Sequence, residues 1–426
     1  MRVNRIGTGL AAAGLMIGAA GANAFAAQDA AGETLTVWIM EGTNPDAEPF
    51  FADVTAAFEE QTGATLDVQF VQWADAKAQF TTGIAGGTLP DVAEVGTTWT
   101  PEFADAGALV DVTERVEGTG LADDLVPALV EAGTVDGGLY GMPWYAGVRS
   151  IIYRTDVFEA AGITEMPATW DELVATGNAI KEAEPEMLPF PIAGDSEYGV
   201  DAFIWGAGGE VATETDGEWA SGLTSAEARE GISFYTSLAT EHEFSTSAAS
   251  TWNEADLRDS FSAGEAAMII AGNWTPGAIV EANPELEGLI GAFPIPGPDG
   301  GLSPSFLGGS HLGIFNTTEN EDLAWTFVEM MTTGEFAAQW GEQSGYFPST
   351  VSMLEDVQAA DDPLVAPFAQ QMAEAGQTVP VTPLYGVIQG NKTMAAMLLS
   401  ILSGDATVDE ATETAAQEMN DVFAGG

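Results

Sequence analysis

The stretch LTVWIM at residues 35–40 is a compact apolar run, and it predicts a buried β-strand. A helix follows it, with phenylalanines on one face, and Gly63 marks its end. The next segments predict a strand at 66–71, a helix at 74–85 and a third strand at 90–95. Strands and helices that alternate at this spacing predict a parallel sheet covered by helices.

The α/β pattern continues beyond this first unit. Residues 151–153 predict another strand, and the sequence Thr169-Trp170-Asp171-Glu172 fits the capping box that opens a long helix. Apolar periodicity predicts further helices at 225–240, 253–263, 320–333, 386–403 and 409–423, and strands at 267–271 and 311–315.

The length indicates two or three folding units, because about 400 mature residues are too many for one typical core, and two lobes are the natural expectation. Composition changes at no single boundary and no low-complexity linker is present, which favours lobes joined by more than one crossover. The segments 137–143 and 294–298, rich in glycine and proline, are the best crossover candidates. We assign residues 28–143 and 297–335 to an N-terminal lobe, and residues 144–296 and 336–426 to a C-terminal lobe.

The first residues have the pattern of a targeting segment. Arg2 and Arg5 precede an uncharged, small-apolar run at 7–22, followed by Ala-x-Ala sequence. This predicts a signal peptide over residues 1–27, since the run is shorter than the roughly 20 residues of a membrane anchor. No cysteine is present, which excludes disulfides, thiolate metal sites and a lipid-modified N-terminal cysteine. We therefore expect an exported protein, periplasmic or otherwise extracytoplasmic, that is not a lipoprotein.

The charge balance is extreme, with 10 Lys+Arg against 65 Asp+Glu and a formal net charge of −55. A surface this negative repels phosphates, which excludes nucleic acid as a partner. The lysines are only Lys77, Lys181 and Lys392, and an acidic, lysine-poor surface is typical of a protein that works in high salt. We interpret the charge as a property of the environment and not of the mechanism.

A series of short motifs follows in a set order along the chain. It begins with Leu89-Pro90-Asp91-Val92 and Gly96-Thr97-Thr98-Trp99, and continues with Tyr140-Gly141-Met142-Pro143-Trp144-Tyr145 and Arg149. Its later members are Trp170-Asp171-Glu172-Leu173, Trp205 with Gly208-Gly209, Gly272-Asn273-Trp274, Gly308-Gly309-Ser310, Gly345-Tyr346-Phe347-Pro348 and Leu402-Ser403-Gly404. In number, order and spacing this series resembles the family 1 extracellular solute-binding proteins, over essentially the whole mature chain.

The resemblance implies an α/β, two-lobe periplasmic-binding-protein fold of type II. Each lobe would be a helix-covered, mostly parallel sheet, with the ligand cleft between the lobes. It also implies a protein that is not an enzyme, closes on its ligand, and delivers it to the permease of an ATP-driven (ABC) transporter. No cofactor and no metal are expected, and we expect a monomer.

The resemblance is closest to one branch of the family. The segments 37–42 and 71–75 look most like members that bind cellobiose-like, chitobiose-like or α-glucoside disaccharides, so a di- or oligosaccharide is the expected ligand. Many members carry an aspartate between the Trp-Tyr pair and the arginine. Here Ala146-Gly147-Val148 stand in that place, so one expected hydroxyl-binding carboxylate is missing.

Aromatic side chains are the first candidates for sugar binding, because their faces stack on the C–H side of a pyranose. Trp274 follows a predicted strand and is the best platform, with a core aromatic as its alternative. Trp144 and Tyr145 lie at an expected crossover, where ligand contact and hinge packing are equally compatible. Trp205 lies beside glycines that let a ligand approach, and Trp99 follows a strand end.

Polar and hydroxyl-bearing side chains complete the expected ligand-binding set: Arg149, Glu41, Asp75, Ser310, His311, Thr98 and Tyr346. For Arg149 the alternative is an ion pair, since the chain is rich in acids. For His311 the alternative is a hydrogen-bonded core histidine. Glu41 and Asp75 stand at the ends of the first two strand units, where a carboxylate can accept hydroxyl hydrogen bonds.

A secreted glycoside hydrolase acting on a similar sugar is the alternative function. Such an enzyme needs a comparable cleft and two carboxylates about 5 to 10 Å apart, which sequence alone does not exclude among 65 acidic residues. No hydrolase motif is present. The two histidines, His242 and His311, are far apart in sequence, and no zinc, calcium or phosphate-loop motif occurs.

Overall fold

The first strand–helix unit follows the predicted order in the computed structural model, which describes residues 30–359 and 362–425. Its elements are β1 (Thr34–Glu41), α2 (Glu48–Thr62), β2 (Thr65–Gln72), α3 (Trp73–Gly86) and β3 (Val92–Gly96). β1 pairs in parallel with β2 on one side and with β3 on the other, as expected. The predicted signal peptide, residues 1–27, lies outside the described residues.

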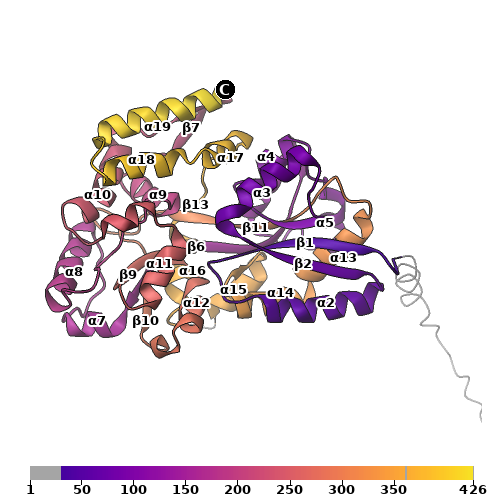
Figure 1. Cartoon of the computed structure of the whole chain (residues 1–426), viewed down its shortest axis with the longest axis horizontal. Helices are drawn as coiled ribbons and strands as arrows, with labels where there is room; N and C mark the ends of the chain where they lie inside the picture. The colour runs from indigo at the N-terminus through magenta and orange to yellow at the C-terminus, as the bar shows by residue number, and fades with distance from the viewer. Residues whose placement is uncertain (1–29, 360–361, 426) are drawn as a thin grey trace, which may run out of the picture.

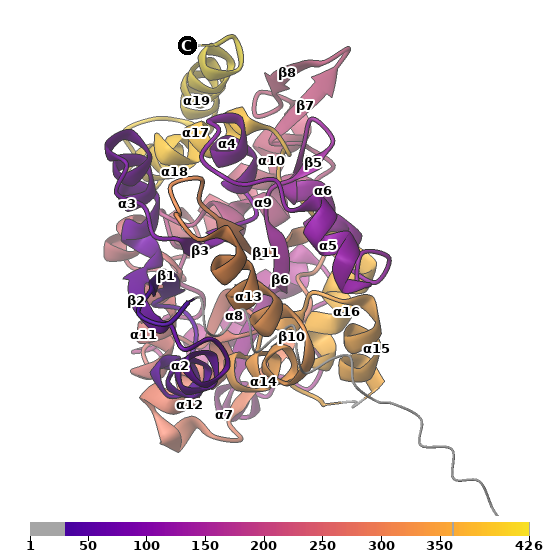
Figure 2. The same ribbon diagram turned by 90° about the vertical axis from the view of Figure 1, so that its right-hand side faces the viewer.

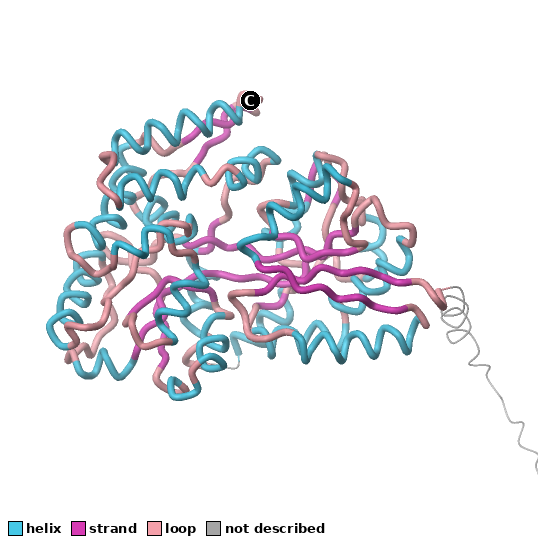
Figure 3. The backbone as a smooth tube through the Cα atoms, viewed as in Figure 1, coloured by secondary structure: helices cyan, strands magenta, loops and turns pink. Residues whose placement is uncertain are grey.

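Two long strands carry the chain between the lobes, β6 (Met142–Arg154) and β11 (Ser305–Ile314). The first half of β6 pairs with β11, which also pairs with β3. From Arg149 onward β6 pairs instead with β9 (Met268–Gly272), and with β10 (Ile290–Phe293) on its other edge. The strands therefore run without a break from one lobe into the other, as the magenta segments of Figure 3 show.

The α/β class is confirmed, but the sheet is less parallel than expected. β6 pairs antiparallel with β9, β10, β11 and the short β12 (Phe347–Pro348), and β11 also runs antiparallel to β3. The physical reason lies in the crossovers: β6 runs from the first lobe into the second and β11 returns, so the two strands point in opposite directions.

The remaining elements cover the two ends of this sheet (Figure 1). Those that follow β3 or return to the first lobe are α4 (Thr100–Asp105), α5 (Thr113–Thr119), α6 (Pro127–Gly133), β4 (Thr134–Val135), β5 (Gly138–Leu139), α13 (Glu321–Thr332) and α14 (Gly334–Ser344). Those between β6 and β11 are α7 (Thr155–Ala160), α8 (Trp170–Ala183), α9 (Glu197–Gly206), β7 (Ala212–Thr215), β8 (Glu218–Ser221), α10 (Ala226–Thr240), η1 (Ser247–Thr251), α11 (Glu254–Ser262), α12 (Thr275–Ala282) and η2 (Pro284–Leu286). After β12 come α15 (Val351–Ala359), α16 (Ala366–Ala375), β13 (Gly376–Gln377), α17 (Pro383–Gly390), α18 (Thr393–Leu402) and α19 (Val408–Phe423).

The lobe boundaries lie a few residues away from the expected ones. The change of strand partners at Arg149 puts the crossover inside β6 and not at residue 143. Trp340 on α14 packs on Phe50 of α2, with ring centroids 5.1 Å apart, so α14 lies against the first lobe although 336–426 was assigned to the second. Over the described residues, no helix is both long and apolar enough to cross a membrane.

The lobes also touch each other away from the sheet. Figure 2 shows α17, which follows the second-lobe elements, beside α4 of the first lobe. On the opposite rim, Arg258 Nη1 donates to the carbonyl of Gly42 at 2.6 Å, and the Asp46 amide donates to Glu281 at 2.9 Å. The structure therefore describes a form in which the two lobes are in contact around the space between them.

Candidate functional site

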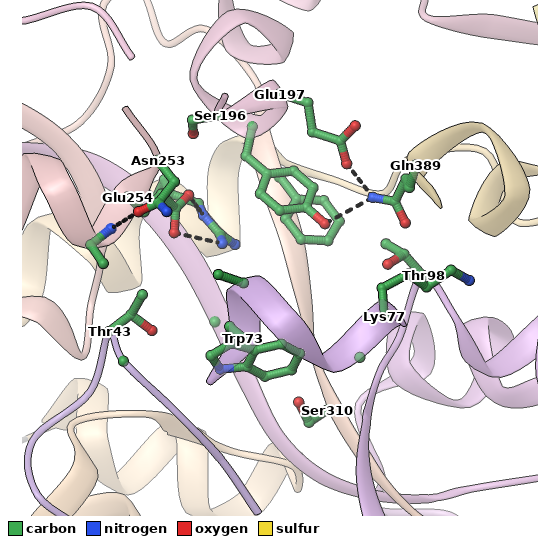
Figure 4. A pocket seen from close by; sticks show the side chains of 18 of the residues that line it. Thr43, Trp73, Lys77, Thr98, Ser196, Glu197, Asn253, Glu254, Ser310 and Gln389 are labelled. Atoms are coloured by element: carbon green, nitrogen blue, oxygen red, sulfur yellow. Dashed lines mark hydrogen bonds and ion pairs between the residues drawn. The ribbon is translucent and has the colours of Figure 1, made fainter. Parts of the chain in front are cut away.

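A cavity of about 330 Å³ lies between the lobes. This volume falls in the range of small-molecule sites in proteins. Strand ends and loops of the first lobe form one wall, and the N-terminal ends of α9 and α11 form part of the other. Figure 4 shows that side chains from both lobes point into this space, among them Trp73 from the first lobe and Glu197 from the second.

The first-lobe wall is built where three parallel strands end. Glu41 ends β1, Trp73 opens α3 directly after β2, and Thr98 and Trp99 follow β3. The carboxyl ends of parallel strands meet at one edge of a sheet, which brings these residues together. The rings of Trp73 and Trp99 lie 5.6 Å apart, and Glu41 accepts a hydrogen bond from Gln72 at 2.7 Å.

A stack of aromatic rings forms the base of the cavity. Tyr145 on β6 stacks on Tyr346 with centroids 3.8 Å apart, and Tyr346 lies 4.8 Å from Trp274. Trp274 in turn lies against two glycines. A β-carbon at Gly147 would lie 2.5 Å from its ring, and one at Gly272 would lie 2.3 Å away, so only glycine leaves room for the indole at these positions.

A buried carboxylate, Glu94 on β3, holds the aromatic base in place. It accepts hydrogen bonds from the Tyr145 hydroxyl, from Ser310 Oγ at 2.9 Å and from the Met40 amide at 2.8 Å. Burial raises the pKa of Glu94 to about 7, although these hydrogen bonds act in the opposite direction. Tyr145 and Ser310 line the cavity. Glu94 therefore fixes the positions of two lining side chains through its hydrogen bonds to them.

The second-lobe wall is centred on a buried ion pair. Arg149 donates two hydrogen bonds to the carboxylate of Glu254, at 3.0 and 3.1 Å. Its guanidinium also lies over the rings of Tyr198 and Trp274, 4.4 and 4.9 Å from their centroids. Arg149 is thus both the expected ion pair and part of the cavity lining.

The two lysines of the cavity lining are also paired with carboxylates. Lys77 contacts Glu102, and Lys392 contacts Asp195 at 2.7 Å. Glu197 accepts a hydrogen bond from Gln389, which also donates to the Tyr198 hydroxyl at 3.1 Å. Because the cationic lining residues already have carboxylate partners, the cavity is suited to a polar ligand without net charge. No cluster of three or more His, Cys, Asp or Glu side chains in 30–359 or 362–425 is placed to hold a metal ion.

Comparison with known proteins identifies the family. Residues 41–338 match the family model described as bacterial extracellular solute-binding protein, which is more than half of the chain. The chain belongs to this family. Its members are non-catalytic solute-binding proteins, so the glycoside hydrolase alternative is not supported.

Relatives of this solute-binding protein match over most of its length. The diacetylchitobiose binding protein DasA of Streptomyces coelicolor is 28% identical over 391 residues, covering 90% of this chain and 88% of the relative. A maltotriose-binding protein of Pyrococcus abyssi is 26% identical, covering 76% and 69%. Among solved structures, an ABC transporter solute-binding protein of Thermotoga lettingae bound with α-D-tagatose superposes with a TM-score of 0.84 at 26% identity, covering 92% and 100%. The periplasmic-binding-protein fold expected from the sequence is therefore confirmed.

Most of the expected ligand-binding residues of this solute-binding protein come together at the cavity. The structure places these among its lining: Trp274, Tyr145, Arg149, Trp99, Thr98, Glu41, Ser310 and Tyr346. Their role in binding remains a prediction.

Four expected residues lie elsewhere. Trp144 stacks on Trp340 at 4.9 Å in the first-lobe core, because β6 alternates its side chains and turns this ring away from the cavity. Trp205 is buried in the second-lobe core, and Asp75 is exposed on α3. His311 is fully buried, with Nε2 2.9 Å from the Leu129 carbonyl and Nδ1 2.8 Å from Thr100 Oγ1, and burial lowers its pKa to about 4.

Several lining residues were not predicted from sequence. Trp73 follows an expected strand, and its position directly after β2 is a signal that could have identified it. Glu197, Tyr198, Glu254 and Gln389 gave no such signal, because nothing local separates them from other residues of their kind.

Proposed function

We propose that this solute-binding protein captures a di- or oligosaccharide in the cleft between its lobes and delivers it to a membrane permease. At the coarser level, it is the substrate-binding component of a carbohydrate ABC importer, as its family and its relatives indicate. The observation that carries the finer proposal is the cavity itself, in which aromatic faces adjoin hydrogen-bonding groups and the three cationic lining side chains are paired with carboxylates.

The chemistry of the lining suits a sugar. Trp73, Trp99 and Trp274 offer aromatic faces for the C–H side of pyranose rings. Glu41 and Glu254 offer carboxylate oxygens and Arg149 offers N–H groups, each already held by a neighbour in a fixed direction. Such preorganised polar groups define which hydroxyls fit.

Lobe closure supplies the capture mechanism. The contacts of Arg258 with Gly42 and of Asp46 with Glu281 join the rims, while the cavity is lined from both lobes. A sugar that touches both walls favours the closed form over the open one by its differential binding energy. Nothing in this mechanism changes the sugar chemically.

The place of action follows from the first residues. We propose export through the segment 1–27, followed by ligand capture in the periplasm or another extracytoplasmic space. Without cysteine, the mature N-terminus carries no thioether-linked lipid.

Calorimetry against a panel of sugars tests the proposal. The panel contains diacetylchitobiose, cellobiose, maltotriose and lactose, with glucose as the monosaccharide. We expect one di- or oligosaccharide to bind in the micromolar range or tighter and to raise the melting temperature. Trp274→Ala should weaken that binding by about tenfold or more, since loss of one stacking face costs on the order of 1.4 kcal/mol.

A matched control separates the site from general effects. Trp219 on β8 lies outside the cavity lining, so Trp219→Ala should bind the same sugar with unchanged affinity. Normal binding by Trp274→Ala would refute the site, and absence of binding across a broad sugar panel would refute the proposed function.

A further inference from the structure

Glu197 is a carboxylate of the cavity lining whose described hydrogen bond comes from an uncharged group. Of the other lining carboxylates, Asp195 and Glu254 each have an ionic partner, and Glu41 accepts a hydrogen bond from Gln72. Glu197 accepts only from the side-chain amide of Gln389, within the described residues. Figure 4 shows its side chain pointing toward Gln389, on the same side of the cavity as Ser196.

A second carboxyl group lies one helical turn further along α9. Asp201 is fully buried, and neither of its oxygens has a hydrogen-bond partner in the described structure. Residues four apart lie on the same face of a helix, so Glu197 and Asp201 repel each other when both are ionised. The described ion pairs include neither of them.

The surroundings of this acid pair provide little positive charge. Among the described residues, the arginine that faces it is Arg149, which already donates from Nε and Nη2 to the carboxylate of Glu254. Lys392 is taken by Asp195. The titratable and charged groups facing the pair are Asp195 and Tyr198 on its own segment, Arg149 on β6, Glu254 on α11, Tyr235 on α10, Tyr385 on α17 and Lys392 before α18.

Burying an unpaired carboxylate away from water costs far more free energy than burying the neutral acid. Burial is the largest cause that raises the pKa of Glu197, to about 7, and the pKa of Asp201 rises well above its ordinary value through burial and through the charge of Glu197. Both shifts favour the protonated acid, and Glu197 exchanges its proton near neutrality.

We propose that Glu197 enters the closed cavity as a neutral carboxylic acid, so that sugar binding takes up a proton. This inference rests on the proposed function and adds a specific chemical feature to it. As an acid, Glu197 can donate its O–H to an acceptor oxygen of the sugar, which a carboxylate cannot do.

The direction of the pH effect follows from lobe closure. The first lobe covers this wall, with Lys77 and Thr98 lining the same cavity, so Glu197 is more hydrated when the lobes part and its pKa then lies closer to the ordinary value. A pKa that is higher in the closed form means that closure is favoured at low pH. Sugar affinity is then fully present below the open-form pKa, and it is lost as pH rises to about 7.

The test is calorimetry with the tightest-binding sugar of the panel, at pH 5, 6, 7 and 8. Each titration is run in two buffers that differ in ionisation enthalpy, which counts the protons taken up per sugar. For the wild type we expect proton uptake between pH 5 and 7, and affinity about tenfold lower at pH 8 than at pH 5, since one unit of pKa shift is tenfold. Glu197→Gln should flatten this profile and reduce the proton uptake.

Three comparisons make the result decisive. Glu227→Gln changes an exposed glutamate in the first turn of α10 and should retain the wild-type profile. Asp201→Asn replaces a buried carboxyl group, whose oxygens have no described hydrogen-bond partner, by a neutral amide and should also retain it. Glu94→Gln reports the share of any pH dependence that comes from the other buried carboxyl group of the site.

Each remaining outcome has a clear meaning. If Glu197→Gln keeps the proton uptake and the pH profile of the wild type, the inference is wrong. If Asp201→Asn alone removes the profile, the exchangeable proton is on Asp201 and the assignment to Glu197 fails. If the wild type binds no sugar at any pH, the proposed function fails, and the inference fails with it.

Discussion

The buried carboxylate Glu94 has hydrogen-bond partners that lie far from it in the sequence of this solute-binding protein. Glu94 accepts from Ser310, 216 positions away, and from Met40, 54 positions away. Ser310 and Tyr145 stand in local motifs that predicted them, but no local pattern distinguishes Glu94 among 65 acidic residues. The role of a residue whose hydrogen-bond partners are all distant in sequence can be identified only from the folded structure.

His311 gives a prediction at this scale. Burial lowers its pKa to about 4. Between this pKa and the ordinary value of about 6.5, the imidazole is protonated in the unfolded chain and neutral in the folded protein. Stability from the neutral ring is present above pH 6.5 and is lost as pH falls toward 4, by up to about 3 kcal/mol. Urea unfolding at pH 7.5, 6.0 and 4.5 measures this loss.

His311→Leu is the informative variant. It should lower the free energy of unfolding at pH 7.5 by about 1–3 kcal/mol, because the Leu129 carbonyl loses its donor. It should also remove most of the decline between pH 6.5 and 4.5. An unchanged acid decline in the variant would show that other groups cause it.

Elements were predicted best where the pattern is local. β1, β2 and β3 with their helices were predicted because each apolar run is bounded by glycine or polar residues. The opening of α8 was also predicted, and Thr169 accepts from the Glu172 amide at 3.2 Å, although the Glu172 carboxylate accepts from Ala168 and not from Thr169. The 13-residue β6 was not predicted as one strand, because its change of partners depends on β9 and β11.

The contact between β6, β9 and Trp274 gives a prediction at the scale of elements. Gly147→Ala would place a β-carbon 2.5 Å from the indole and push the ring into the cavity. We expect sugar affinity to fall by about tenfold or more, or about 1.4 kcal/mol. Calorimetry with the panel sugar measures it.

Two further variants test whether overlap with the indole causes the loss of sugar affinity in Gly147→Ala. Gly147→Ala combined with Trp274→Phe relieves the overlap with a smaller ring and should bind more tightly than Gly147→Ala alone. Gly118→Ala, where a β-carbon meets nothing within 4 Å, should leave affinity unchanged. If the double variant binds more weakly than Gly147→Ala, the overlap is not the cause.

Charge governs the molecule as a whole. All eight lysines and arginines in the described part of the chain form ion pairs: Lys77, Arg115, Arg149, Arg154, Lys181, Arg229, Arg258 and Lys392. Most of the 65 acidic residues therefore have no cationic partner and repel one another. The sequence predicted this excess, and its relation to a high-salt habitat stays a prediction.

Salt should therefore stabilise the folded protein. Raising NaCl from 0.01 to 1 M shortens the screening length from about 30 to about 3 Å, which weakens the self-repulsion of the compact state. We expect the melting temperature to rise by about 5 °C or more at pH 7, measured by calorimetry. The rise should shrink at pH 4.5, where many carboxylates are protonated, and a constant or falling melting temperature at pH 7 would contradict the prediction.

The pairing of β3 with β11 also determines when the first lobe can be completed. Val92 faces Ile314 across these strands, so β3 lacks one neighbour until residue 314 has been synthesised. Until then the emerging chain carries an open sheet edge, which is prone to wrong pairing. The first lobe thus completes its folding only after a late segment of the chain has been synthesised. A chain that folds late stays unfolded for most of its synthesis, and an unfolded chain can pass through a translocation channel.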